Sequence, residues 1–327
     1  MLQQTQVQTV IPYWNRWMTA LPTLQDLAGV AEDRLLKLWE GLGYYSRVRN
    51  LQRAARMVIH QYHGRIPSQR TTLLELPGVG PYTAGAIASL AFNQPEPLVD
   101  GNVARVLSRL NRLEGDPRDS APSDQLWQLA QGLVTSAGEL KSVPSTPMAA
   151  GRYSALNQGL MELGATVCLP RNPTCLLCPV SGECQAYQTG EVDRFPMVRP
   201  RVKATRVRYL VAVVTHAGKW WMRKRNVGEV NQGLWEFPQL EVTDDPREAS
   251  TSARNWLGVP ESQLMPLPRI RHAITRYQIT LDVFMVSLKR VPDVIQNGEW
   301  VTSEEVGELA LTAAHRKIAG SLLSRHN

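Results

Sequence analysis

The chain has 327 residues, which is enough for two domains of ordinary size. Its composition is 43% hydrophobic and 20% charged, which is typical of folded proteins and argues against a largely disordered chain. The net charge of +7 favours a polyanionic partner, although charge alone does not identify one. The sequence has neither an apolar run long enough to span a bilayer nor the pattern of a signal peptide. We therefore expect a cytoplasmic protein with no membrane partner.

Residues 1–190 carry apolar side chains mainly at helical spacing. The pattern is clear at residues 35–39 and 103–110, where apolar positions recur three and four residues apart. This spacing gathers the apolar side chains on one face of each helix, where they can form a core. The sequence therefore predicts a helical domain over residues 1–190.

A glycine-rich turn lies within this domain, at residues 76–85 (LPGVGPYTAG). Gly78 and Gly80 allow a tight turn with uncovered backbone amides, and Pro81 suits the first position of a helix that runs to about Phe92. Exposed amides at a helix N-terminus bind anions, and a DNA phosphate is the natural occupant. The sequence leaves one alternative open, an ordinary packing corner between two helices.

All the cysteines of the chain lie within residues 168–184. They are Cys168, Cys175, Cys178 and Cys184. Four thiolates this close together suit one metal centre. Zinc ribbons usually have two Cys-x2-Cys pairs set well apart, whereas this loop has one such pair, flanked at intervals of six and five residues. A 4Fe-4S cluster fits that spacing best. Zinc is the second choice, and two disulfides are the last, because nothing else indicates secretion.

The pattern changes beyond residue 190. Between Arg194 and Arg208 the chain is rich in basic residues and proline and has no acid, which predicts an exposed basic linker over residues 191–208. Alternation typical of strands follows at residues 209–215, 220–225 and 278–288. The last residues return to helical spacing. We therefore expect a second domain of α+β class at residues 209–327.

The glycine turn and the cysteine loop together resemble the helix-hairpin-helix DNA glycosylases that carry an iron–sulfur cluster, the endonuclease III superfamily. Within it, the chain is most similar to the adenine DNA glycosylases of the MutY type. The segments that carry the resemblance are residues 1–7 (MLQQTQV), 39–45 (WEGLGYY), 76–85, 98–106 (LVDGNVARV), 157–165 and 233–238 (GLWEFP). The resemblance implies a mainly α helix-hairpin-helix DNA glycosylase domain with the cluster loop, followed by an α+β Nudix-like domain.

The resemblance implies base excision repair, in which adenine mispaired with 8-oxoguanine or guanine is removed from double-stranded DNA. Bifunctional relatives have a lysine just after the hairpin, where this chain has Tyr82. Tyrosine cannot form an imine, so we expect a monofunctional hydrolase rather than a lyase. Asp100 is similar to the family's catalytic aspartate, which would stabilise or trap the positive charge that builds on the sugar. Asn102 is expected to orient Asp100 or a water molecule.

Both residues also have simpler interpretations. Without the resemblance, Asp100 would be assigned as the N-cap of the helix that starts near Val103. Asn102 would then be a residue of the helix start. The position of Asp100 in the family motif is what favours a catalytic role.

Several base-binding residues are implied by the resemblance alone. Gln4 matches the position that wedges into the duplex when adenine is flipped out, and Leu2 and Thr5 flank it. Tyr45 would lie near the damaged base, and Gln158 would hydrogen-bond the flipped adenine. Each of these residues could instead be a surface or packing residue.

The second domain departs from two patterns of its fold. A working Nudix hydrolase needs a helix with several glutamates for magnesium, and the stretch after Gly233 lacks the required Glu-Glu pair. Pyrophosphatase activity is therefore not expected. In the family, a loop that often reads Phe-Ser-His recognises 8-oxoguanine, and here Ile274, Thr275 and Arg276 stand in its place. We expect Thr275 and Arg276 to retain recognition with altered contacts.

The resemblance also implies a glutamate two residues before the Met-Leu-Gln-Gln-Thr motif, which would protonate the departing adenine and activate water. The sequence begins at Met1 of that motif. We expect that the start is assigned too far downstream. The alternative is a non-catalytic, DNA-binding or lesion-marking paralogue. In both cases the expectation is a monomer associated with a bacterial nucleoid.

Overall fold

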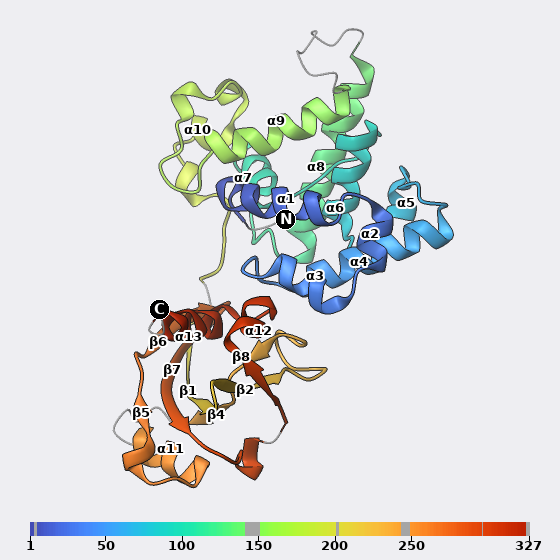
Figure 1. Ribbon diagram of the computed structural model, residues 1–327. Coiled ribbons are helices and arrows are strands. Elements are labelled where there is room, and N and C mark those ends of the chain that lie inside the picture. Colours follow the sequence, from blue (N-terminus) through green and yellow to red (C-terminus); the bar gives the residue numbers. More distant parts are fainter. Residues whose placement is uncertain (3–4, 141–150, 201–202, 243–248, 296, 325–327) are drawn as a thin grey trace. The chain divides into compact units, whose positions relative to one another are not determined.

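The computed structural model describes residues 1–2, 5–140, 151–200, 203–242, 249–295 and 297–324 (Figure 1). The chain divides into two compact units. We call Arg53–Arg201 the helical unit, and we call Met1–Gln52 together with Val202–Asn327 the sheet unit. The helix α4 (Ser46–Gln61) crosses the boundary between them. Each unit is described separately.

The helical unit consists of short helices joined by tight turns. Its elements after α4 are α5 (Arg70–Leu73), α6 (Pro81–Ala86), the π-helical turn η1 (Ile87–Ala91), α7 (Gly101–Leu110), α8 (Ser120–Glu139), α9 (Arg152–Thr166), η2 (Cys175–Leu177), η3 (Ser181–Glu183), α10 (Gln185–Gln188) and η4 (Val192–Arg194). Pro81 begins α6, as the glycine turn predicts, and Gly80 is its N-cap. The buried side chains of α7 and α8 form a core around Leu98, Val103 and Leu126. This core holds α7 in place, and α7 carries Asn102 and begins directly after its N-cap, Asp100.

Helices α7 and α9 lie very close together in this unit, and a glycine makes the approach possible. A Cβ atom at Gly164 would lie only 2.7 Å from the Cβ atom of Asn102. Any larger residue at position 164 would therefore push the two helices apart. The glycine of the Leu163-Gly164-Ala165 segment thus has a packing role beside the predicted site.

The sheet unit begins with three helices and the start of a fourth. They are α1 (Val7–Ala20), α2 (Leu24–Gly29), α3 (Glu32–Trp39) and the first turns of α4. Trp17 of α1 and Trp39 of α3 are both buried and pack edge to face, with ring centroids 5.7 Å apart. Thr23 and Asp26 form a capping box that starts α2.

The remainder of the sheet unit is a mixed β-sheet with helices on both of its faces. The strands are β1 (Thr205–His216), β2 (Lys219–Lys224), β3 (Trp235–Glu236), β4 (Gln239–Val242), β5 (Met265–Pro266), β6 (Ile270–Ile274), β7 (Tyr277–Ser287) and β8 (Glu299–Thr302). The helical elements are α11 (Ala249–Leu257), η6 (Glu261–Gln263), η7 (Asp293–Ile295), α12 (Ser303–Glu308) and α13 (Ala313–Leu323). Strand β1 runs parallel to β7 along its whole length and antiparallel to β2 and β4.

Side-chain alternation along β1 forms two separate cores. Val211 and Val213 pack on one face of the sheet with Ile318 of α13. Ala212 and Val214 point to the other face, toward Leu257 of α11. The sequence analysis predicted strands at residues 209–215, 220–225 and 278–288, and the structure confirms them as β1, β2 and β7.

The first helices are joined to the C-terminal part of the sheet unit by charged contacts. The Glu40 carboxylate accepts hydrogen bonds from the guanidinium Nε of Arg316 at 2.8 Å and from the backbone amide of Leu311 at 3.1 Å. Lys37 donates to the other carboxylate oxygen of Glu40 at 2.9 Å.

In the part of the chain that the structure describes, no helix has the length and apolar character needed to cross a membrane.

Candidate active site and cysteine loop

Asp100 lies at the start of α7 and is the N-cap of that helix. Its Oδ1 atom accepts hydrogen bonds from the backbone amides of Asn102 at 2.9 Å and Val103 at 2.7 Å. Its Oδ2 atom accepts one longer hydrogen bond, at 3.3 Å, from the side-chain amide of Asn102. The capping role is therefore real, and it also fixes the direction of the second carboxylate oxygen. The backbone amides take up Oδ1 only, so the capping role does not exclude the predicted catalytic role of Oδ2.

Tyr82 shares this site. Its ring packs on the core that contains Leu98 and Val103, and its hydroxyl lies 3.9 Å from the sulfur of Met161. Partial burial raises the pKa of the Tyr82 phenol, and the negative charge of Asp100 raises it further. The phenol is therefore neutral near pH 7, and it offers no amine to a sugar.

Arg105, which the sequence interpretation did not identify, links the start of α7 to the cysteine loop. Its NH2 group donates to the side-chain oxygen of Asn102 at 2.9 Å and to the carbonyl of Gly164 at 2.6 Å. Its Nε donates to the carbonyl of Cys168 at 2.7 Å. A continuous path of hydrogen bonds therefore runs from Asp100 through Asn102 and Arg105 to the first cysteine of the loop.

The four predicted metal ligands come together in the fold. Their side chains line one small cavity with Arg109, Val167, Ser181, Tyr187 and Val192. Burial raises the pKa of the Cys175 thiol, and the charges of Cys168 and Cys184 raise it further. Four thiolates would repel one another here, so a cationic centre is needed to hold them in the charged form.

A cubane binds one thiolate at each of its irons, and four cysteines around a common cavity provide that set of donors. Among the residues that the structure describes, no three histidine, cysteine, aspartate or glutamate side chains are close enough together to hold a single metal ion. The four cysteines thus lie around one cavity, where they can act together as ligands.

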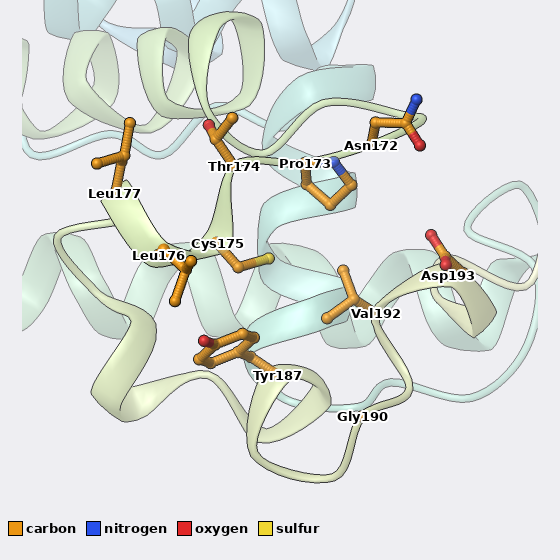
Figure 2. A pocket seen from close by; sticks show the side chains of 10 residues that line it. All are labelled: Asn172, Pro173, Thr174, Cys175, Leu176, Leu177, Tyr187, Gly190, Val192 and Asp193. Carbon is orange, nitrogen blue, oxygen red and sulfur yellow. The ribbon is translucent and has the colours of Figure 1, made fainter.

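A second, larger pocket of about 710 Å³ is lined by residues of the cysteine loop and of the segment that follows it (Figure 2). Cys175, Tyr187 and Val192 face one another across it, although they come from three different segments (Figure 2). Leu176 and Leu177 at its rim are strongly exposed. The pocket includes neither Asp100 nor Tyr82, so it is separate from the predicted reaction site.

The glycine turn has the expected backbone conformation. Gly78 has a φ of 80°, which favours glycine because it has no Cβ atom, and Gly80 is the extended N-cap of α6. Gln158 lies on α9 and donates from its side-chain amide to the hydroxyl of Ser154 at 3.0 Å. The glycine turn and helix α9 belong to the helical unit, as do Asp100, Tyr82 and Asn102.

The predicted contacts at the start of the chain are in the sheet unit. Leu2 is exposed, and its carbonyl accepts a hydrogen bond from the amide of Thr5 at 3.4 Å. Gln4 lies outside the described residues.

Tyr45 and its neighbour Tyr44 differ in exposure. The Tyr45 side chain is buried, and burial raises its pKa to about 12. The Tyr44 ring is 54% exposed, its φ is 49°, and the Arg47 guanidinium lies 5.5 Å from its centroid. Because a ring must be accessible to contact a base, Tyr44 is better placed for this role than Tyr45. The sequence analysis did not select Tyr44, although the two glycines before it, Gly41 and Gly43, indicate an irregular backbone.

Thr275 and Arg276 form the tip of the hairpin between β6 and β7, where Ile274 pairs with Tyr277. Both side chains are exposed. Thr275 has a φ of 51°, a conformation that is unfavourable for a β-branched residue. Arg276 donates to the hydroxyl of Tyr277 at 3.1 Å. These two residues therefore project from a short, strained turn in the sheet unit.

Comparison with known proteins decides the family. Residues 1–131 match the HhH-GPD superfamily base excision DNA repair proteins, and residues 209–320 match the NUDIX domain. An adenine DNA glycosylase from Mus musculus is 36% identical over 372 residues, covering 97% of this chain and 69% of the mouse protein. The chain belongs to the adenine DNA glycosylase family.

Other relatives agree with this assignment. An adenine DNA glycosylase from Homo sapiens is 36% identical, with 97% of this chain and 66% of the human protein covered. One from Arabidopsis thaliana is 34% identical, with 99% and 50% covered. The chain thus spans between half and about two thirds of the length of these relatives. A solved structure of a thermostable thymine-DNA glycosylase shows 29% identity and a TM-score of 0.47, with 57% of this chain and 80% of that chain covered.

Family membership confirms the predicted order of domains, a helical HhH-GPD domain followed by a Nudix-like domain. It also confirms the class of enzyme. The protein is a DNA N-glycosylase of base excision repair, a hydrolase of N-glycosidic bonds whose partner is DNA. The non-catalytic alternative is not favoured.

Proposed function

We propose that this glycosylase removes adenine opposite 8-oxoguanine or guanine and leaves an abasic site without cutting the strand. The observation that carries the proposal is the carboxylate of Asp100 at the start of α7, close enough to the phenol of Tyr82 on α6 for its charge to raise the pKa of that phenol. A carboxylate there can stabilise a sugar cation, and the phenol beside it cannot form a Schiff base with the sugar.

The chemistry at Asp100 follows from the two environments of its oxygen atoms. As the bond between C1′ and adenine breaks, positive charge builds on the sugar ring. Oδ1 is held by two backbone amides, so Oδ2 is the oxygen that faces the charge or bonds to C1′. The departing adenine takes up a proton, and water then adds to C1′, displaces Oδ2 if that oxygen has bonded there, and gives up a proton. We assign both proton transfers to the glutamate that the resemblance implies two residues before Met1, which would protonate adenine and then accept the proton of the water, because adenine leaves slowly as an anion.

We propose that the four cysteines hold a 4Fe-4S cluster. The donor set fits, because four thiolates line one cavity and Cys175 is already disfavoured as a free thiolate. When bound, the cluster cross-links the loop at four points and takes no part in the reaction. The Arg105 contacts would then give the start of α7 a rigid support.

Recognition of the opposite base is assigned to the sheet unit. Thr275 and Arg276 offer a hydroxyl and a guanidinium at an exposed hairpin tip, which suits hydrogen bonding to a damaged purine. Tyr44 offers an exposed ring for stacking. We propose that the enzyme acts as a monomer in the cytoplasm, on nucleoid DNA.

A single-turnover assay tests the proposed reaction. The polypeptide, extended upstream through the glutamate, is incubated with duplexes that contain A:8-oxoG, A:G or A:T. We expect free adenine from the first two and little from the third, and strand cleavage only after alkali treatment. A covalent adduct trapped by borohydride would contradict the monofunctional assignment.

Iron analysis tests the cluster separately. Protein purified without oxygen should be brown and contain about four irons per chain. Cys178→Ser should lose iron and DNA binding. Stoichiometric zinc without iron, from cells grown with ample iron, would contradict the cluster.

A further inference from the structure

Arg109 is a buried arginine that the reaction does not use. It lies on the last turn of α7, and only 2% of its surface is exposed. Its guanidinium lines the cavity that holds the four cysteines. Position and burial together make it a part of the cysteine site rather than of the DNA surface.

The side chain makes contacts on both sides of the cysteine loop. NH1 donates to the sulfur of Cys168 at 3.3 Å and to the carbonyl of Leu169 at 2.7 Å. Nε donates to the carbonyls of Phe195 at 2.9 Å and Val192 at 3.1 Å. Arg109 therefore ties the segment that enters the loop to the segment that leaves it.

The charge of Arg109 lacks a carboxylate counter-ion within the described part of the chain. Its guanidinium donates there to carbonyl oxygens and to the Cys168 sulfur. A buried cation without a counter-ion is costly, so negative charge on the cysteine sulfurs would stabilise it. Arg105 differs from Arg109 in its contact with the cysteine, because it donates to the carbonyl of Cys168 and Arg109 donates to the sulfur.

We propose that Arg109 is a positioning residue for the cluster, whose charge-assisted hydrogen bond to the Cys168 sulfur favours the reduced state and closes the loop around the metal centre. The inference rests on the proposed 4Fe-4S cluster. Adding an electron makes the cluster more negative, so a cation that hydrogen-bonds a ligand sulfur stabilises the reduced form more than the oxidised form. Removing the cation therefore lowers the reduction potential.

The test is a redox titration of the full-length protein, purified without oxygen and followed by visible absorbance, in which an external reductant supplies one electron per cluster. We expect Arg109→Gln to change the ratio of oxidised to reduced cluster about tenfold at a fixed potential, a downward shift of about 59 mV for a one-electron couple. It should also release iron faster to a chelator. Arg109→Lys, which keeps a cation but loses the planar set of donors, should fall between wild type and Arg109→Gln.

Arg112→Gln is the matched control, since Arg112 is a nearby arginine that pairs with Glu191 on the surface. It should leave the potential unchanged. An unchanged potential in an iron-loaded Arg109→Gln protein would overturn the proposal, as would an equal shift in Arg112→Gln. If Arg109→Gln does not fold, Arg109→Lys decides: a lowered potential supports the proposal and a wild-type potential overturns it. Wild-type protein without iron would instead refute the proposed cluster itself.

Discussion

Helix α7 and the hairpin tip between β6 and β7 hold the side chains that we propose for catalysis and recognition in opposite ways. Asp100, Asn102 and Arg105 are fixed by hydrogen bonds that connect α7 with α9 and the cysteine loop. Thr275 and Arg276 are exposed, and within the described residues their side chains donate hydrogen bonds to the adjacent residues Ile274 and Tyr277. The difference suits two tasks. Bond cleavage needs groups held in place before the substrate arrives, whereas recognition of a base tolerates side chains that become ordered on binding.

The largest effect is expected at Asp100. Asp100→Asn should lower single-turnover cleavage at least about a hundredfold, because a neutral amide loses about 3 kcal/mol of stabilisation of the sugar cation. Stability should hardly change, since asparagine is also a good N-cap. Asp100→Ala should lose the same activity and in addition about 1 kcal/mol of unfolding free energy. A similar rate for Asp100→Asn and wild type would remove Asp100 from the mechanism.

A smaller effect on both stability and rate is expected at Arg105. Arg105→Met leaves the Asn102 side chain and the carbonyls of Gly164 and Cys168 without a donor, so the unfolding free energy should fall by about 2 kcal/mol. Cleavage should slow about tenfold, because Asn102 no longer holds Asp100. The measurements are chemical denaturation and single-turnover kinetics. A stable variant with a wild-type rate would show that the path of hydrogen bonds does not support the site.

Acid should destabilise the sheet unit through His315. Burial lowers the pKa of this imidazole to about 3, and the charges of Arg225, His272 and Arg223 contribute. The ring is held neutral, since its Nδ1 accepts a hydrogen bond from the amide of Phe237 at 3.0 Å. The unfolded chain takes up a proton near pH 6.5 and the folded protein does not.

The stabilisation from a neutral His315 is therefore complete above pH 6.5 and is lost as the pH falls toward 3, at about 1.4 kcal/mol per pH unit. Thermal unfolding of the sheet unit across this range measures the slope. His315→Gln should flatten it, while His60→Gln, a change at an exposed position, is the control. An equal slope in His315→Gln and wild type would contradict this source of the acid sensitivity.

The smallest effect is expected at the hairpin tip. Thr275→Gly should relieve the strain of a positive φ and raise the unfolding free energy by about 1 kcal/mol or less. If the Thr275 hydroxyl contacts the lesion, the preference for A:8-oxoG over A:G should nevertheless fall several-fold. Competition binding with the two duplexes measures that preference. An unchanged preference would assign recognition to other residues.

Patterns within one segment were predictable from the sequence, and contacts between distant segments were not. The Gly78–Pro81 turn and the strands at β1 and β7 follow from local conformational preferences and from alternation, and the structure has them. The spacing of the cysteines placed them in one loop, and the fold gathers them around one cavity. Family membership confirmed the two predicted domains in their order. The metal in the cysteine cavity stays a prediction.

Arg105 and Arg109 could not be recognised from the sequence alone. Basic residues on a helix are usually exposed, and nothing local shows that these two face inward toward the cysteine loop. The difference in exposure between Tyr44 and Tyr45 could not be read from the sequence for a similar reason. The backbone φ is positive at both Gly43 and Tyr44, and the Tyr44 ring is exposed while the Tyr45 ring is buried. The grouping of residues 1–52 with the C-terminal part depends on pairs such as Glu40 and Arg316, which lie far apart in sequence.

We propose that α7 provides the chemistry and that the hairpin tip provides recognition. This division is tested most directly by measuring the binding constant and the single-turnover rate at saturating enzyme for Asp100→Asn and Arg276→Ala on an A:8-oxoG duplex. Both variants are made in the polypeptide extended through the upstream glutamate. We predict that Asp100→Asn binds like wild type and cleaves at least about a hundredfold more slowly. Arg276→Ala should bind several-fold more weakly and cleave at the wild-type rate once saturated. The reverse pattern, in which Asp100→Asn loses affinity and Arg276→Ala loses the saturated rate, would contradict the account.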